Sequence, residues 1–169
     1  METKMTLNDV HAELKRLLGE FIDFCDEHEL RYFLAYGSLL GAVRAGGFIP
    51  WDDDVDVLMP RPDYERFQEL YVKSPQSSFI LMLPGSAGFP SSFTKLVSAR
   101  TRFESADHLF PPEYGVCLDI FPLDGVPRRL PKLHYWAVQE LTAIRPRAYV
   151  KDKPHIVAQE PSLLGTAKR

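Results

Sequence analysis

The sequence lacks three features that would place it in a special class of proteins. It has only 2 cysteines among 169 residues, Cys25 and Cys117, and both stand in apolar contexts, so we expect buried free thiols without a disulfide or a cysteine metal site. No apolar run approaches the roughly 20 residues of a membrane span, and the N-terminus does not resemble a secretory signal. The formal net charge is -3, which argues against a general nucleic-acid binder. We therefore expect a cytoplasmic protein that binds no nucleic acid.

The sequence does contain the mixed periodicities of an α+β domain. Apolar residues that recur every three or four positions predict helices, and short apolar runs that end at glycine or proline predict strands. The predicted helices span residues 6–30, 38–45, 62–73 and 132–144. The predicted strands span residues 32–36, 55–59, 79–83, 93–97, 101–105 and 116–121, with 93–97 and 101–105 as partners and 32–36 buried. We expect one domain over residues 1–150, built around one sheet, and a loose tail over 151–169.

A run of aspartates at 52–54 and 56 is the strongest candidate for chemistry. Asp54 and Asp56 lie two apart in a predicted strand, so their carboxylates share one face. Adjacent carboxylates repel unless a cation lies between them, and Mg²⁺ is a hard ion that binds one or two carboxylates together with substrate phosphates. A solvated acidic loop is the alternative interpretation. The alternation of aspartate with valine inside an apolar strand favours the metal site.

Two further segments are candidates for the same site. Gly37 and Ser38 stand where a strand passes into a helix, where backbone N–H groups and a hydroxyl can approach a phosphate. Asp119 is a charge inside an apolar strand and needs a partner there. That partner is either a structural arginine or lysine, or a metal ion for which Asp119 is the third ligand, and we favour the metal.

Lys95 and Arg44 are candidate phosphate-binding cations. Lys95 alternates with apolar residues and is predicted to point into the site, although the spacing fits an exposed strand lysine nearly as well. Arg44 ends the second predicted helix. Trp51 precedes the aspartates and offers an aromatic face for substrate. The five histidines show no metal-ligand spacing and receive no role.

These segments together resemble the LicD family, a branch of the DNA polymerase beta-like nucleotidyltransferase superfamily that includes fukutin. The resemblance covers about residues 20–127. It is carried by YGSLLGAVR (36–44), GGFIPWDDDVDV (46–57), MPR (59–61) with Asp63-Tyr64, Lys95-Leu96 with Thr101, and GVCLDIFPLDG (115–125). Two departures stand out: the resemblance fades after Pro127, and Ser98 stands where the family often has an acidic residue.

The resemblance implies a nucleotidyltransferase-like mixed sheet flanked by helices, in which Gly37-Ser38 opens the site. Asp54, Asp56 and Asp119 would bind Mg²⁺, with Mn²⁺ as a possible substitute, and would be the catalytic carboxylates. The implied reaction transfers a phospho-alcohol such as phosphocholine from a CDP-alcohol to a glycan hydroxyl, of lipopolysaccharide or teichoic acid. Two alternatives stay open: a nucleotidyltransferase that uses a nucleoside triphosphate, and a catalytically weak domain that binds a nucleotide or a partner.

Overall fold

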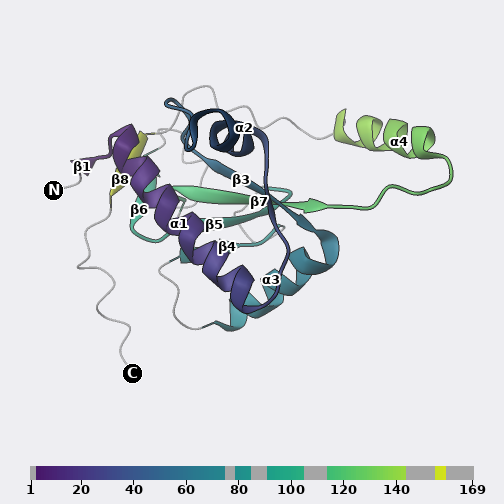
Figure 1. Ribbon diagram of the computed structural model, residues 1–169, viewed down its shortest axis with the longest axis horizontal. Helices are drawn as coiled ribbons and strands as arrows, with labels where there is room; N and C mark the ends of the chain where they lie inside the picture. Colours follow the sequence, from purple (N-terminus) through teal and green to yellow (C-terminus); the bar gives the residue numbers. More distant parts are fainter. Residues whose placement is uncertain (1–2, 75–78, 85–90, 105–113, 144–154, 159–169) are drawn as a thin grey trace.

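A mixed five-stranded sheet forms the body of the protein (Figure 1). The computed structural model describes residues 3–74, 79–84, 91–104, 114–143 and 155–158. In the order of the sheet, its strands are β2 (Phe33–Leu34), β3 (Val55–Pro60), β7 (Cys117–Leu123), β5 (Thr94–Ser98) and β4 (Phe79–Met82). The pair β3–β7 is parallel and the other three pairs are antiparallel. The predicted α+β class with a mixed sheet is confirmed.

Two helices, α1 (Leu7–Glu27) and α3 (Arg61–Lys73), pack across one face of this sheet (Figure 1). The buried residues of α1 recur every three or four positions, as a one-sided helix requires; they are Val10, Leu14, Leu17, Phe21 and Cys25. They form one core with Val55, Val57 and Met59 of β3 and with Tyr64, Phe67 and Tyr71 of α3. The predicted start of α1 is confirmed, because Thr6 and Asp9 form a reciprocal capping box.

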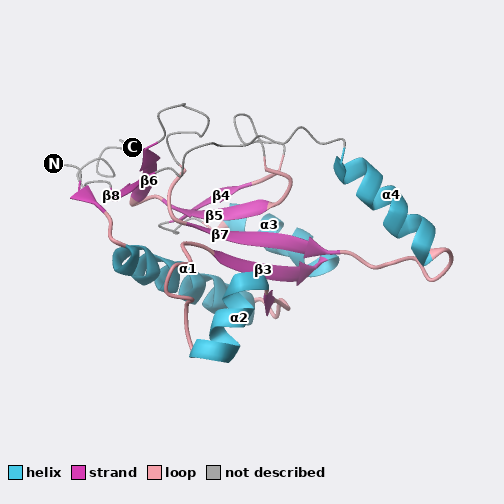
Figure 2. Cartoon of the chain, turned by 90° about the horizontal axis from the view of Figure 1, so that it is seen from above, coloured by secondary structure: helices cyan, strands magenta, loops and turns pink. Residues whose placement is uncertain are grey.

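The short helix α2 (Tyr36–Ala45) packs beside β3 on the same side as α1 (Figure 2). It ends at Gly46, whose φ of 66° is left-handed and favours glycine. The sequence predicted a buried strand over 32–36, and this was wrong in extent and burial. Only Phe33 and Leu34 are extended, at the edge of the sheet, and Phe33 is 53% exposed. Helix α2 begins at Tyr36, so the extended segment before it is too short to form a central strand.

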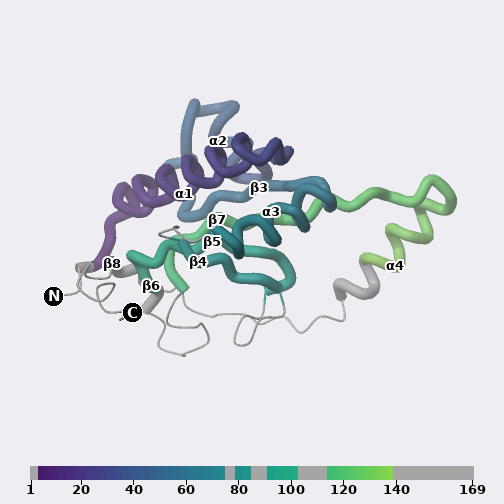
Figure 3. Tube along the Cα trace, turned by 90° about the horizontal axis from the view of Figure 1, so that it is seen from below, coloured from purple at the N-terminus to yellow at the C-terminus, as the bar shows by residue number. Residues whose placement is uncertain are grey.

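The remaining elements lie outside the five-stranded sheet. Helix α4 (Pro131–Ala143) stands apart from the body, as the Cα trace in Figure 3 shows. A second sheet has the order β1 (Thr3–Lys4), β8 (His155–Ala158) and β6 (Thr101–Glu104). No helix in the described part of the chain combines the length and the apolarity that a membrane crossing requires.

This second sheet differs from the expectations. The predicted pairing of 93–97 with 101–105 is wrong, because β5 pairs with β4 and β7 whereas β6 pairs with β8. Residues 155–158 were expected in a loose tail and form β8; residues 151–154 and 159–169 lie outside the described residues. Cys25 and Cys117 are both free and buried, as predicted.

A buried hydroxyl fixes α3 to β5 and provides a test of this packing. The Tyr64 hydroxyl lies 2.8 Å from Thr94 Oγ1 and accepts the backbone N–H of Thr94 at 3.1 Å. Tyr64→Phe leaves that buried N–H without its acceptor, so we expect a loss of about 1–3 kcal/mol in the free energy of unfolding. Urea unfolding measures it. Tyr135→Phe, on the exposed α4, is the control and should change stability by less than about 0.5 kcal/mol. Equal values for the two variants would contradict the arrangement.

Candidate active site

Three charged side chains stand in a row across three neighbouring strands. Asp56 of β3 is in register with Asp119 of β7, and Asp119 is in register with Lys95 of β5. Neighbouring strands lie about 4.8 Å apart, so residues in register on one face are close neighbours. Val55 and Val57 face the helices, and alternation therefore turns Asp56 to the opposite face. We call Lys95, Asp119 and Asp56, together with Asp54, the charged row.

The surroundings of Asp54 and Asp56 disfavour the ionised form of both carboxyl groups. Both are partly buried, and burial is the largest cause that raises the pKa of each to about 6. Repulsion adds to it: Asp52 and Asp119 act on Asp54, and Asp54 and Asp119 act on Asp56. Lys95 opposes the shift in both cases. Carboxylates in this condition are stabilised by a cation placed between them.

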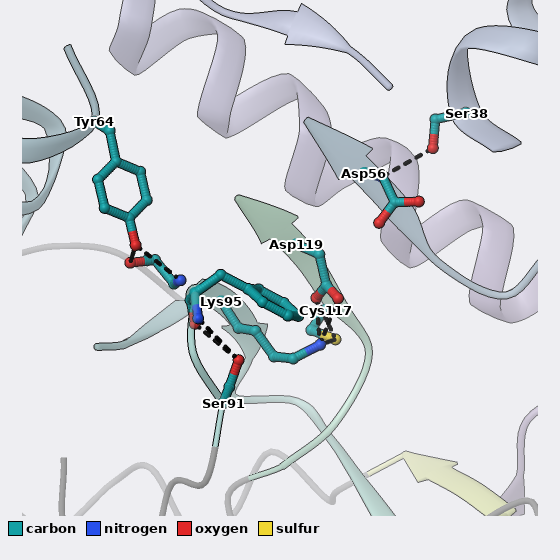
Figure 4. A network of polar contacts seen from close by, with 9 residues as sticks. Ser38, Asp56, Tyr64, Ser91, Lys95, Cys117 and Asp119 are labelled. Carbon is teal, nitrogen blue, oxygen red and sulfur yellow. Dashed lines mark hydrogen bonds and ion pairs between the residues drawn. The ribbon is translucent and has the colours of Figure 1, made fainter. Parts of the chain in front are cut away.

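Asp119 has a cationic partner within the protein. Lys95 Nζ donates to both of its carboxylate oxygens, at 2.6 Å from Oδ2 and closer still to Oδ1 (Figure 4). Both residues are buried. Of the two partners that the sequence left open for Asp119, this structure contains the lysine. Lys95 was predicted to meet substrate phosphate; in this structure it points at Asp119, and the phosphate-binding role stays a prediction.

Burial alone would lower the pKa of Lys95, but the carboxylate of Asp119 outweighs burial and raises it. The ammonium therefore stays charged. Its Nζ also lies 5.0 Å from the ring centre of Phe93 and 5.5 Å from that of Tyr114. Cys117 is itself protonated at neutral pH, because burial raises the pKa of its thiol to about 12.

Gly37 and Ser38 connect the first turn of α2 to the charged row. The Ser38 hydroxyl accepts the backbone N–H of Asp56 at 2.9 Å (Figure 4). A Cβ on Gly37 would lie 2.6 Å from Asp52 Oδ2, so glycine is what lets this carboxylate approach the helix N-terminus. The structure thus places Ser38 beside Asp56 and Gly37 beside Asp52, and the role of both residues in phosphate binding stays a prediction.

Arg44 and Trp51 are not brought to the row. Arg44 is exposed in the last turn of α2, six residues and so about 9 Å of helix beyond Ser38. Trp51 is 78% exposed. Neither residue contacts a carboxylate of the row among the described interactions, and their roles in substrate binding stay predictions.

The sequence missed one residue that shapes the aspartate loop. His11 of α1 makes a hydrogen bond from its Nε2 to the backbone oxygen of Asp52, at 2.6 Å, and stacks on Phe48 with ring centres 4.7 Å apart. The spacing of the five histidines carries information on metal binding only. The sequence pattern around His11 does not indicate its contact with Asp52, which lies 41 residues further along the chain.

An aromatic group continues the face of the charged row; the sequence offered Tyr36 as an aromatic face for substrate but not Phe93 or Phe121. Phe121 follows Asp119 by two residues in β7, and Phe93 precedes Lys95 by two. The rings of Phe93 and Phe121 are 4.2 Å apart, and Tyr36 meets Phe121 edge to face at 5.6 Å. Tyr36 has a φ of 43°, an unfavourable value for a tyrosine. The same period of two that revealed Asp54 and Asp56 would have revealed this alternation.

Ser98 lies on the other face of β5. It is fully buried, and its hydroxyl donates to Glu13 of α1. The serine that stands where the family often has an acidic residue therefore contacts the helix layer, and it removes no ligand from the charged row.

An apolar cavity lies on the helix side of the same region. It measures about 210 Å³ and is lined by Lys15, Leu18, Leu34, Ser38, Ala42, Gly47, Phe48 and Val55. Its exposed lining is apolar, although Lys15 and Ser38 are among the lining residues.

The donor set fits a divalent cation with one rearrangement. As the side chains stand, no three Asp, Glu, His or Cys groups in the described ranges converge on one point. Asp119 is the member that is turned away, toward Lys95. Its register with Asp56 would let a rotated Asp119 side chain offer an oxygen to an ion held by Asp54 and Asp56, and oxygen atoms are the ligands that a hard cation prefers.

The raised pKa values predict that the acidic row costs stability at neutral pH. The folded state binds protons at Asp54 and Asp56 more tightly than the unfolded state does, so stability falls as pH rises from about 4 to 6 and stays low above 6. We expect Asp54→Asn to raise Tm by about 2–4 °C at pH 7.5, a value that allows for solvent screening, and by much less at pH 4. Thermal unfolding at both pH values measures it, with the exposed Glu69→Gln as control. A gain that is equal at the two pH values would contradict the electrostatic cause.

Comparison with known proteins identifies the family of this chain. The family model described as LicD/FKTN/FKRP, nucleotidyltransferase domain, matches residues 29–127. The lipopolysaccharide cholinephosphotransferase LicD of Haemophilus influenzae is 33% identical over 134 residues, which are 78% of this chain and 49% of that protein. An uncharacterized protein of Rickettsia typhi is 35% identical over 57 residues, 34% of this chain and 18% of its own length. The chain spans about half the length of the LicD relative. The match includes every residue of the charged row, and the chain belongs to the LicD/FKTN/FKRP nucleotidyltransferase-domain family.

Proposed function

We propose that this protein is a magnesium-dependent transferase that moves a phospho-alcohol, such as phosphocholine, from a CDP-alcohol to a hydroxyl of a glycan. The observation that carries the proposal is the row of Asp54, Asp56 and Asp119 on the open face of the sheet, beside the N-terminus of α2. Family membership and the name of the Haemophilus relative support the choice of group and a lipopolysaccharide-type acceptor. A nucleotidyltransferase-like arrangement of the sheet and a cytoplasmic location belong to the same proposal.

Asp54, Asp56 and Asp119 would hold Mg²⁺, and Mn²⁺ is a possible substitute. When bound, the ion would neutralise charge on the donor diphosphate and on the leaving nucleotide. The chain's own groups supply the orientation. Ser38 fixes the backbone of Asp56, and the N–H groups in the first turn of α2 face the side from which a phosphate would come. Proton removal from the acceptor by Asp119 would require its contact with Lys95 to loosen, because Lys95 donates to both oxygens.

A nucleotidyltransferase that uses a nucleoside triphosphate is the alternative within enzymes. It would use the same carboxylates, so the products distinguish the two. Release of CMP from a CDP-alcohol supports the proposed reaction, whereas release of pyrophosphate from CTP or ATP supports the alternative. Calorimetric titration with CDP-choline, CDP-ribitol, CTP and ATP in the presence of Mg²⁺ tests the third possibility, a degenerate domain, because binding of none of them would favour it.

Replacement of the metal-facing carboxylates tests the catalytic assignment. Asp54→Asn and Asp56→Asn keep shape and remove charge, so we expect at least about a thousandfold loss of magnesium-dependent CMP release, the scale of losing a main electrostatic contribution. Asp53→Asn is the matched control in the same run; Asp53 is exposed, and most activity should remain. Unchanged turnover in Asp54→Asn would refute the assignment.

The aromatic group beside the row gives a test of the transferred alcohol. A quaternary ammonium is attracted to aromatic faces by about 0.5–2 kcal/mol, and Tyr36 presents an exposed ring against Phe121. We expect Tyr36→Ala to raise KM for CDP-choline about threefold to thirtyfold and to change KM for CDP-ribitol little, because ribitol carries no cation. Steady-state kinetics with both donors measure the difference. An equal change for both donors would indicate that Tyr36 contacts the nucleotide instead.

A further inference from the structure

The position of Lys95 has no use in the reaction proposed above. Only 9% of its surface is exposed, although lysine is a strongly hydrated residue. The ammonium is enclosed by the Asp119 carboxylate, the Cys117 sulfur at 3.7 Å and the rings of Phe93 and Tyr114. Such an enclosure leaves the charge little freedom to reach a substrate that arrives from solvent.

The ammonium occupies the place where Asp119 would otherwise meet a metal ion. It contacts both carboxylate oxygens, and these are the atoms that a third metal ligand would offer. We propose that Lys95 is a built-in counter-ion: it holds Asp119 while no divalent cation is bound, and a divalent cation must share Asp119 with it. This inference rests on the metal site of the proposed function, and it adds that Lys95 regulates how tightly that site binds a divalent cation.

The charges of the row support a control of this kind. Three carboxylates and one ammonium carry a formal charge of -2. One divalent cation therefore neutralises the row. A second divalent cation would meet no remaining charge until an anionic donor arrives, so we expect one Mn²⁺ to bind without nucleotide. Removal of the ammonium leaves a charge of -3 and frees Asp119.

The experiment compares the affinity for Mn²⁺ alone in four forms of the full chain. They are wild type, Lys95→Met, Lys95→Arg and Lys73→Met. Methionine keeps the aliphatic length and removes the charge, arginine keeps the charge, and Lys73 is an exposed lysine in the last turn of α3 that controls for overall charge. Calorimetry at pH 7.5 gives the Kd, and thermal unfolding with and without Mn²⁺ gives a second readout that does not depend on activity.

We expect Lys95→Met to bind Mn²⁺ at least about tenfold more tightly than wild type, because a neighbouring positive charge has been removed. Its Tm without metal should fall, since Asp119 loses its partner, and saturating Mn²⁺ should close the gap to wild type. Lys95→Arg and Lys73→Met should stay within about threefold of wild type, a difference below 1 kcal/mol. Equal or weaker Mn²⁺ binding by Lys95→Met would overturn the proposal and assign Lys95 to positioning of Asp119.

Two further outcomes are decisive. If Lys95→Met does not fold alone, recovery of its fold on addition of millimolar Mn²⁺ supports the counter-ion role, and failure to recover overturns it. If wild type does not bind Mn²⁺ at all, the metal site of the proposed function fails as well. A third pattern separates the two proposals: wild type binds Mn²⁺, Asp54→Asn abolishes that binding, and Lys95→Met leaves the Kd unchanged. In that case the metal site stands and only the counter-ion role of Lys95 is refuted.

Discussion

The pairing of β7 with β3 on one side and β5 on the other is the constraint on which the candidate site depends. The three strands come from distant parts of the chain, with Asp56 and Asp119 separated by 63 residues, and their register places Asp56, Asp119 and Lys95 in one line. Alternation along each strand then assigns the two faces: the main core, with Val55, Leu96 and Ile120, to the helices, and the charged row to the opposite side. A shift of β7 by one residue would move Asp119 into the core and Ile120 into the site. The packing of α1 and α3 therefore fixes the geometry of the carboxylates without touching them.

The same arrangement divides the acidic charge into a compensated and an uncompensated part. Lys95 compensates Asp119, deep at the centre of the sheet, where an unpaired carboxylate would be most costly. Asp54 and Asp56 lie closer to solvent and receive no cation among the described contacts, which is reflected in the pKa of about 6 for each. The carboxylate of Asp119 is paired with a lysine of the protein, whereas the carboxylates of Asp54 and Asp56, which a ligand would contact, lie nearer to the surface.

The sequence predicted the local features well because their signals are local. Alternation in β3, the capping box of α1 and the glycine after α2 each depend on residues within a few positions, and all three are present. It failed where the answer lies in pairing between distant segments. The partner of β6 proved to be β8, and Lys95 proved to contact Asp119 across 24 residues. A lysine that alternates with apolar residues has the same pattern whether it faces a phosphate or a carboxylate, and only the register of β5 against β7 decides between them.

The electrostatic cost of the site indicates that its carboxylates meet a ligand. A face that binds nothing gains nothing from carboxylates that burial and mutual repulsion destabilise, because neutral residues of similar shape would be more stable at these positions. The surrounding structure nevertheless supports them. Ser38 holds the backbone of Asp56, Gly37 leaves room for Asp52, and Tyr36 keeps a left-handed φ that places its ring on Phe121. Unfavourable features that cluster in one place, each maintained by its neighbours, are typical of functional sites. The cluster here surrounds the face over which a cation and a phosphate would lie.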